Sequence, residues 1–133
     1  MKLLTIAGKA LAAAVLAGFA FGASAQKTQL TVYTALETDQ LKAYQSAFEK
    51  ANPNIEIVWV RDSTGIITAK LMAEKANPKA DVIMGVAATS MAIFDKEGML
   101  TPYAPAGLAR LSPQYRDPKN PPAWVGMDVW GAT

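Results

Sequence analysis

The chain has 133 residues, of which 13 are lysine or arginine and 11 are aspartate or glutamate, and it contains neither cysteine nor histidine. Without cysteine, neither a disulfide framework nor a thiolate metal site can form. Without histidine, the usual general base is missing, which excludes histidine-dependent serine or cysteine catalysis within these residues. We therefore predict a protein that is not an enzyme and that needs no cofactor.

The first 25 residues have the pattern of a secretory signal peptide. Lys2 precedes an apolar run over residues 3–21, and Ala23-Ser24-Ala25 provides a small-x-small cleavage site. Cleavage after Ala25 leaves 108 of the 133 residues and removes two lysines, so that eleven basic and eleven acidic side chains remain. A net charge of zero gives no electrostatic reason to expect binding to nucleic acid or to an anionic membrane. The alternative is a transmembrane anchor, which Lys9 within the apolar run disfavours.

The next residues predict a strand and then a helix. Residues 30–34 are β-branched or aromatic except for Leu30, as is typical of a strand. Residues 39–51 predict a helix, because their apolar positions recur at i, i+3 and i+7. Thr38 is the expected N-cap of this helix, and Asn52-Pro53 the expected stop.

The same alternation continues through the middle of the chain. Residues 55–60 predict a second strand, and residues 66–76 a second helix. Residues 81–86 are nearly all apolar, which indicates a strand buried on both faces of a parallel sheet. A third helix is expected over residues 89–97, with Gly98 ending it. This order predicts an α/β fold in three layers, a parallel sheet with helices on both faces.

The last third of the chain has a different composition. Residues 101–123 contain six prolines and predict an irregular connection, with one helical turn near 108–111. Residues 124–130 predict a final strand. We therefore divide the mature chain into an α/β core over 26–100, a proline-rich connection over 101–123 and a strand segment over 124–133.

Three loops are candidates for a binding site, because ligands of open parallel sheets bind beyond the carboxyl ends of the strands. These loops are Ala35–Thr38, Asp62–Gly65 and Ala87–Ser90, and each leads into a predicted helix N-terminus, where free backbone N–H groups favour an anion. Simpler interpretations remain open for each loop. Ser63 has the position of an ordinary N-cap, and Glu37 that of a solvated surface residue.

Three segments carry a resemblance to a known family: LTVYTALETDQLKAYQSAFEKANP, VRDSTGIITAKLMAEKANPKADVIMG and PPAWVGMDVW. Residues 28–133 resemble the periplasmic substrate-binding proteins of bacterial ABC importers. They are most similar to the branch that includes ferric-iron and polyamine binders, and within it to proteins of 2-aminoethylphosphonate uptake. The resemblance implies a type II periplasmic-binding-protein fold, in which two α/β lobes close on the ligand and the first sheet begins with the strand order 2-1-3.

Proteins of this family run to about three times the mature length, with two lobes of ordinary domain size. The resemblance therefore implies that this chain is an N-terminal fragment holding an incomplete first lobe, and that residues 124–130 lead towards a missing second lobe. A cleft with one wall leaves most of a ligand in solvent, so we expect residues 26–133 alone to bind weakly.

The resemblance also implies a function and a set of site residues. The protein would be a periplasmic, monomeric solute-binding component that takes up a small phosphonate and delivers it to an inner-membrane ABC permease. Ferric iron or a polyamine is the alternative ligand, and a small secreted interaction protein is the alternative of another class. An intact sheet that buries Trp124 and Trp130 would favour the latter. The phosphonate would contact the second and third loops, Glu37 would face the ammonium group, and the full set of expected ligand-binding residues is Thr34, Glu37, Ser63, Thr64, Gly65, Ala88 and Thr89.

Overall fold

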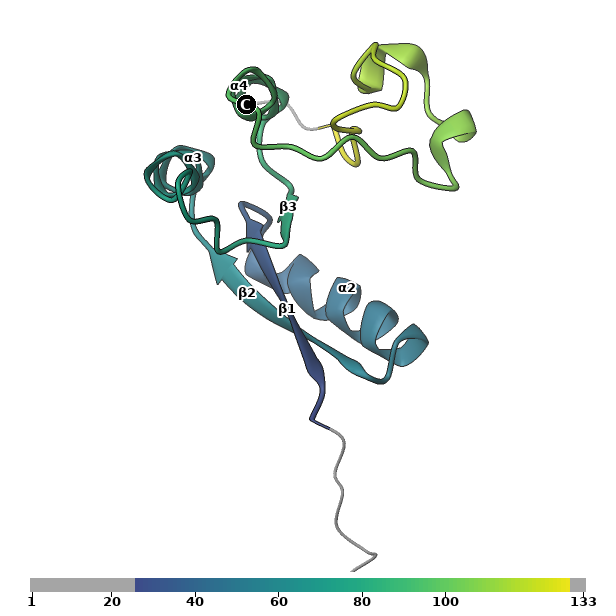
Figure 1. Ribbon diagram of the computed structural model, residues 1–133. Helices are drawn as coiled ribbons and strands as arrows, with labels where there is room; N and C mark the ends of the chain where they lie inside the picture. Colours follow the sequence, from purple (N-terminus) through teal and green to yellow (C-terminus); the bar gives the residue numbers. More distant parts are fainter. Residues whose placement is uncertain (1–25, 130–133) are drawn as a thin grey trace, which may run out of the picture.

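The computed structural model describes residues 26–129, and its core is a parallel sheet of three strands (Figure 1). The strands are β1 (Thr28–Thr34), β2 (Ile55–Arg61) and β3 (Val82–Met84). They lie in the order β2-β1-β3, with both neighbours of β1 parallel to it, which confirms the predicted order 2-1-3. The predicted signal peptide lies outside the described residues.

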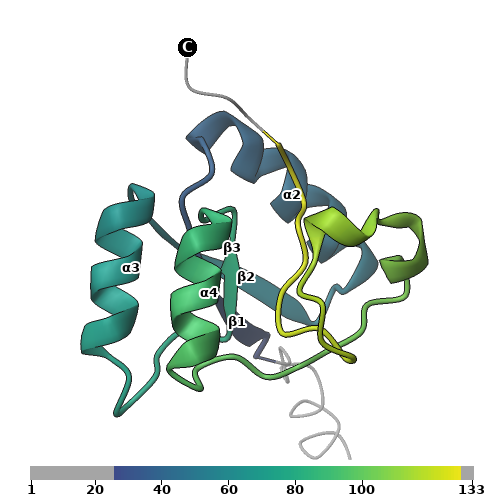
Figure 2. The same cartoon turned by 90° about the horizontal axis from the view of Figure 1, so that it is seen from above.

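Helices cover both faces of this sheet, as predicted (Figures 1 and 2). The helix α2 (Thr38–Ala51) packs on one face, where Trp59 Nε1 of β2 donates a hydrogen bond of 3.0 Å to Gln45 Oε1. The helices α3 (Thr64–Ala73) and α4 (Ala88–Lys96) lie on the other face. No helix among residues 26–129 is long and apolar enough to cross a membrane.

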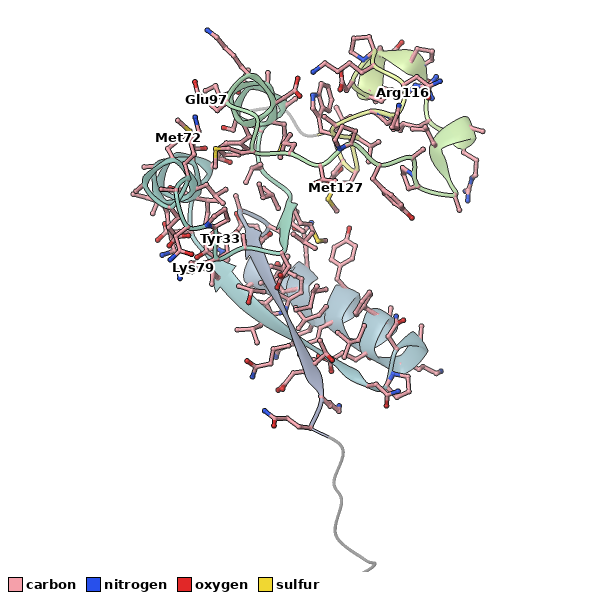
Figure 3. The ribbon with its side chains drawn as sticks, in the orientation of Figure 1. Tyr33, Met72, Lys79, Glu97, Arg116 and Met127 are labelled. Carbon is pink, nitrogen blue, oxygen red and sulfur yellow. The ribbon has the colours of Figure 1, made fainter. Side chains whose placement is uncertain are left out.

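The main hydrophobic core lies between the sheet and the helices α3 and α4. Its buried members are Tyr33, Ile67, Leu71 and Phe94, and Phe94 has no exposed surface. Tyr33 projects from β1 towards α3, where Met72 is packed at the margin of the same cluster (Figure 3). The β-branched and aromatic pattern of β1 thus supplies the sheet side of the core, and the i, i+4 spacing of α3 supplies the helix side.

The helix boundaries differ from the sequence prediction in all three helices, and α4 begins and ends one residue earlier than predicted. Glu37, and not Thr38, is the N-cap of α2, and its backbone N–H donates to Gln40 Oε1 at 3.2 Å. The helix α3 begins two residues before the predicted start, because Ser63 caps it by accepting a hydrogen bond of 3.4 Å from Ile66 N. It ends at Ala73 and not at residue 76, because Glu74 N bonds the carbonyls of the preceding turn and closes the helix there.

The strand β3 is shorter and less buried than predicted. It has three residues, and Val82 is 38% exposed, so the expectation of a strand buried on both faces is wrong for the described residues. The physical reason is that β3 pairs only with β1, which leaves its other edge without a neighbouring strand in the described part of the chain.

The proline-rich residues beyond α4 run beside this free edge of β3 (Figure 2). They contain the short 3-10 helices η2 (Leu108–Arg110), which confirms the predicted helical turn, and η3 (Pro113–Tyr115). The strand predicted over residues 124–130 does not form within the described residues. Val125 makes a single antiparallel bridge to Arg116, so this segment folds back on the proline-rich region and does not join the sheet, and residue 130 lies outside the described range.

Candidate functional site

A cleft of about 650 Å³ opens at the carboxyl edge of the sheet, where the loops after β1 and β2 meet. Parallel strands end at the same edge, so the order β2-β1 brings residues about 25 positions apart in the sequence into contact there. The cleft therefore lies where the sequence predicted a ligand site. Its walls consist of Ala35, Leu36, Glu37, Gln40, Arg61, Asp62, Ser63, Thr64 and Asp128.

Thr34 and Leu36 shape the cleft from below. Thr34 is completely buried, and its hydroxyl oxygen accepts a hydrogen bond of 3.1 Å from Leu36 N. Leu36 is also buried, and a Cβ added to Gly85 would overlap its side chain. Gly85 has a φ of +66°, a conformation that favours glycine. Thr34, one of the predicted ligand residues, is thus withdrawn from the cleft surface and holds the loop that bears Glu37.

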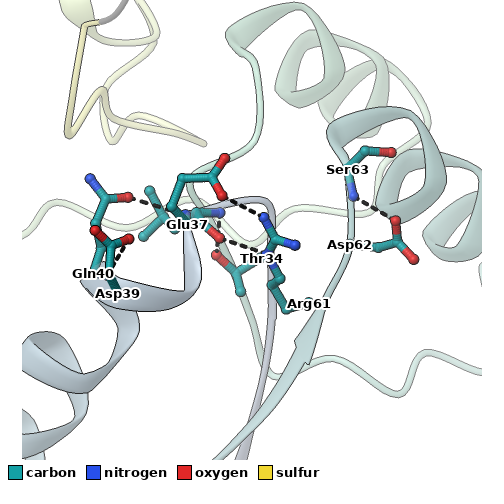
Figure 4. A network of polar contacts seen from close by, with 8 residues as sticks. Thr34, Glu37, Asp39, Gln40, Arg61, Asp62 and Ser63 are labelled. Carbon is teal, nitrogen blue, oxygen red and sulfur yellow. Dashed lines mark hydrogen bonds and ion pairs between the residues drawn. The ribbon is translucent and has the colours of Figure 1, made fainter.

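Ser63, Thr64 and Gly65 form the N-terminus of α3 at the opposite wall. Ser63 is exposed, and its Oγ accepts from Ile66 N, as the simpler N-cap interpretation predicted; the same hydroxyl retains a proton to donate. Asp62 Oδ1 accepts from Ser63 N at 2.7 Å (Figure 4). Gly65 is exposed, and a Cβ added there would meet no atom within 4 Å, so a ligand has room to approach.

Ala88 and Thr89, at the N-terminus of α4, do not line this cleft. Both are exposed, and Ala88 lines a neighbouring hollow of about 400 Å³ that shares Thr64 and Asp128 with the cleft. Ser90 is buried, and its hydroxyl receives a hydrogen bond of 2.9 Å from Thr68 of α3, which fixes the two helices beside each other. Of the predicted ligand residues, Glu37, Ser63 and Thr64 line the cleft and Thr64 and Ala88 line the adjoining hollow. The others, Thr34, Gly65 and Thr89, line neither.

The sequence analysis missed Arg61, the last residue of β2. Its Nη2 donates to Glu37 Oε2 at 2.8 Å, and its Nε donates to the carbonyl oxygen of Leu36 at 3.0 Å (Figure 4). Glu37, expected to face a ligand cation, thus has a protein cation as its partner in this structure. The signal that would have found this pair is the strand order itself, because order 2-1 places the end of β2 beside the loop after β1.

The charges around the cleft are unequal. Glu37, Asp62 and Asp128 contribute three carboxylates, whereas Arg61 is the one basic residue among the described residues of the lining. Carboxylates do not gather into a group of three that could hold a metal ion anywhere within residues 26–129.

Tyr33 lies in the core behind this site and does not belong to it. Its hydroxyl donates a hydrogen bond of 2.9 Å to Glu74 Oε2, and Lys70 lies over its ring and also pairs with Glu74. Burial, followed by the hydrogen bond to Glu74, raises the pKa of Tyr33 above its ordinary value. A neutral, buried phenol belongs to the hydrophobic core and does not suit the role of a tyrosinate ligand.

Comparison with known proteins gives a consistent result. A probable ABC transporter periplasmic-binding protein of Sinorhizobium fredii, y4fP, is 37% identical over 105 residues, which are 79% of this chain and 28% of the relative. The periplasmic binding protein P5PA superposes with a TM-score of 0.61 and 28% identity over 67% of this chain and 28% of that one. The periplasmic binding protein AfuA of Actinobacillus pleuropneumoniae, solved with fructose-6-phosphate bound, gives a TM-score of 0.62 and 26% identity over 69% of this chain and 28% of that one.

The chain thus spans little more than a quarter of the length of the relatives that it matches. Within that span the agreement in fold extends from the strand order to the helices on both faces. A family model described as bacterial extracellular solute-binding protein matches residues 34–129, and the chain belongs to that family.

Proposed function

We propose that this chain is part of the solute-binding component of an ABC importer, and that it captures a small phosphonate such as 2-aminoethylphosphonate in the periplasm for delivery to an inner-membrane permease. The observation that carries the proposal is the N-terminus of α3, which presents Ser63 and Thr64 to a cleft whose other wall holds Glu37. Hydroxyls and helix N-terminal N–H groups suit an oxyanion, and a carboxylate suits an ammonium group.

The phosphonate end of the ligand is assigned to the two helix N-termini. Thr64 lines both hollows, and Ala88 lines the second, so an oxyanion between them receives N–H groups from α3 and α4. A relative solved with a phosphate ester, fructose-6-phosphate, supports an oxyanion ligand. Thr89 lies in the first turn of α4 and extends the same set of donors. Thr34 contributes indirectly, by positioning the loop that bears Glu37.

A polyamine is the second candidate ligand. The observation in its favour is the excess of carboxylates in the cleft, where Glu37, Asp62 and Asp128 outnumber the single cation Arg61. Ferric iron is a further alternative ligand. It requires several oxygen ligands that converge on one point, and residues 26–129 do not contain a group of three carboxylates that could hold a metal ion. Calorimetry with 2-aminoethylphosphonate, spermidine and ferric citrate on the full-length product of the gene separates the three. Tight binding of spermidine or iron without phosphonate binding would overturn the phosphonate assignment.

The anion site is tested by removing its hydroxyls. Ser63→Ala and Thr64→Ala are expected to weaken phosphonate binding by about 1–3 kcal/mol for each lost donor. Ser46→Ala is the matched control, because Ser46 is an exposed serine of α2 that does not line the cleft. Unchanged calorimetric affinity in both cleft variants would place the anion elsewhere.

A further inference from the structure

The ion pair between Glu37 and Arg61 is the feature of the cleft that the proposed function does not yet use. Both side chains line the cleft, from the loop after β1 and from the end of β2 respectively. The side chain of Glu37 is 74% exposed and that of Arg61 is 38% exposed, so both are reachable by a ligand. An exposed pair contributes little to stability, so the fold does not depend on it.

The guanidinium of Arg61 is held in place and yet only partly used. The bond from Nε to Leu36 O anchors it to the backbone of a buried residue, and the bond from Nη2 goes to Glu37. A guanidinium has five N–H donors, and within residues 26–129 these two bonds leave Nη1 without a protein partner. A planar donor fixed in this way is suited to receive an oxyanion.

The neighbouring carboxylate decides which oxyanion is accepted. A simple anion that binds Arg61 has to displace Glu37 or lie beside its negative charge, and either arrangement costs free energy. A zwitterion avoids this cost, because its cationic end replaces Arg61 as the partner of Glu37. Its anionic end then binds Arg61 together with the N-terminus of α3, since Arg61, Ser63 and Thr64 line the same cleft. One ion pair is then exchanged for two, and the three carboxylates of the lining favour the cationic end.

We propose that Arg61 is a ligand-binding residue of this cleft and that Glu37 is its competing counter-ion, so that the pair selects zwitterionic oxyanions over simple ones. This inference rests on the proposed function, and it adds the chemical class that the site accepts and the residues that enforce the choice. Glu37 thus acts twice, as the partner of the ligand cation and as the group that rejects ligands without one.

The test uses two phosphonates with the same two-carbon chain, 2-aminoethylphosphonate and ethylphosphonate, of which the second lacks the terminal ammonium group. Calorimetry on the full-length product of the gene should show that the protein prefers the aminated probe. Glu37→Gln is expected to weaken binding of 2-aminoethylphosphonate by about ten- to a hundredfold and to strengthen binding of ethylphosphonate, because the competing charge is gone. Arg61→Gln is expected to weaken the binding of both probes, because the guanidinium that binds the phosphonate group is removed.

Two control variants match these changes in charge. Glu56→Gln removes an exposed carboxylate of β2, and Arg110→Gln removes an exposed guanidinium of η2; neither residue lines the cleft, and both variants should bind as the unaltered protein does. Equal shifts for both probes in Glu37→Gln would overturn the inference while leaving the function in place. Unchanged affinities of both probes for the Arg61→Gln variant would also overturn the inference and leave the proposed function in place. Failure of the unaltered protein to bind either probe would instead overturn the proposed function, and the inference with it.

Discussion

Residues 28–100 and residues 101–129 are ordered in different ways. The first region is held by a parallel ladder and by a core that includes Tyr33, Ile67 and Phe94. The second has two 3-10 helices and one isolated bridge, and individual hydrogen bonds order it, such as those from Tyr103 N to Pro122 O and from Asp117 N to Trp124 O. Most of the cleft lining, including Glu37, Arg61 and Ser63, belongs to the first region, and the second region adds Asp128.

The largest expected effect comes from the core of the first region. Phe94→Ala removes a ring with no exposed surface, and we expect a loss of about 3–5 kcal/mol in the free energy of unfolding. Tyr103→Ala is the control in the second region, because Tyr103 is 70% exposed, and it should change stability by less than about 0.5 kcal/mol. Urea denaturation followed by circular dichroism measures both; equal losses would show that the two regions do not differ as described.

A smaller loss is expected at the junction between the site and the core. Gly85→Ala puts a side chain at a φ of +66° and against Leu36, and we expect it to destabilise the protein by about 2–4 kcal/mol. Adding Leu36→Ala makes room for the new methyl group, so the double variant should lose less than the sum of the two single losses. Strict additivity in denaturation experiments would mean that the two side chains do not compete for the same space.

The second region is probed through Asp117, a buried carboxylate that accepts hydrogen bonds from Ala123 N at 2.8 Å and Lys119 N at 3.3 Å. The bond from Ala123 contributes most to holding the pKa of Asp117 below its ordinary value, and burial opposes it. A lowered pKa in the folded state means that the stabilisation is present above the ordinary aspartate pKa of about 3.9 and is lost as the pH falls through the lowered value.

The measurement for Asp117 is the amide chemical shift of Ala123 as a function of pH. We expect a transition with its midpoint below about 3.9, together with lower protection of the amides of this loop against exchange on the acid side, relative to their intrinsic rates, and little change in the sheet. Asp117→Asn should abolish the transition. A midpoint at or above the ordinary value would contradict the hydrogen-bonded arrangement.

The smallest effect on stability is expected at Gly65, where the two roles of the α3 N-terminus can be separated. Gly65→Ala meets no neighbouring atom, so it should stabilise the helix by up to about 1 kcal/mol. Gly65 lines neither hollow, but it follows Thr64 at the helix N-terminus to which the phosphonate is assigned, so the added methyl group should hinder the approach of the phosphonate and lower its affinity. A melting curve and calorimetry on the same variant test this; a gain in stability without a loss of affinity would remove Gly65 from the site.

Most strands and helices of the first region could be predicted, because each forms from a residue pattern within its own segment of the sequence. The β-branched and aromatic residues of 30–34 and the helical spacing within α2 and α3 are visible in the sequence, and these segments form β1, α2 and α3 in the structure. The positions of the helix ends were predicted less accurately than the helices themselves. Thr38 has a better capping side chain than Glu37, yet the chain turns at Glu37, whose carboxylate is bound by Arg61 and whose N–H is bound by Gln40.

The strand segment could not be predicted, because a strand needs a partner. Residues 124–129 have the composition of a strand, but in the described structure their neighbour is Arg116 and not β3. Because no strand pairs with the outer edge of β3 in the described residues, that edge is free and Val82 is exposed. Composition indicates that a segment can be extended, and only the tertiary structure determines whether another strand lies beside it.

Periodicity and composition are sufficient to predict the fold class and the three loops at the carboxyl edge, and composition alone excludes histidine and cysteine chemistry within these residues. Only the tertiary structure decided which residues share a cleft. It withdrew Thr34 into the core, placed Ala88 in a separate hollow and paired Glu37 with Arg61, 24 residues away. The physical reason is that strand order converts distance along the chain into contact at the sheet edge, and the packing of Leu36 on Gly85 fixes which side chains of that edge remain exposed.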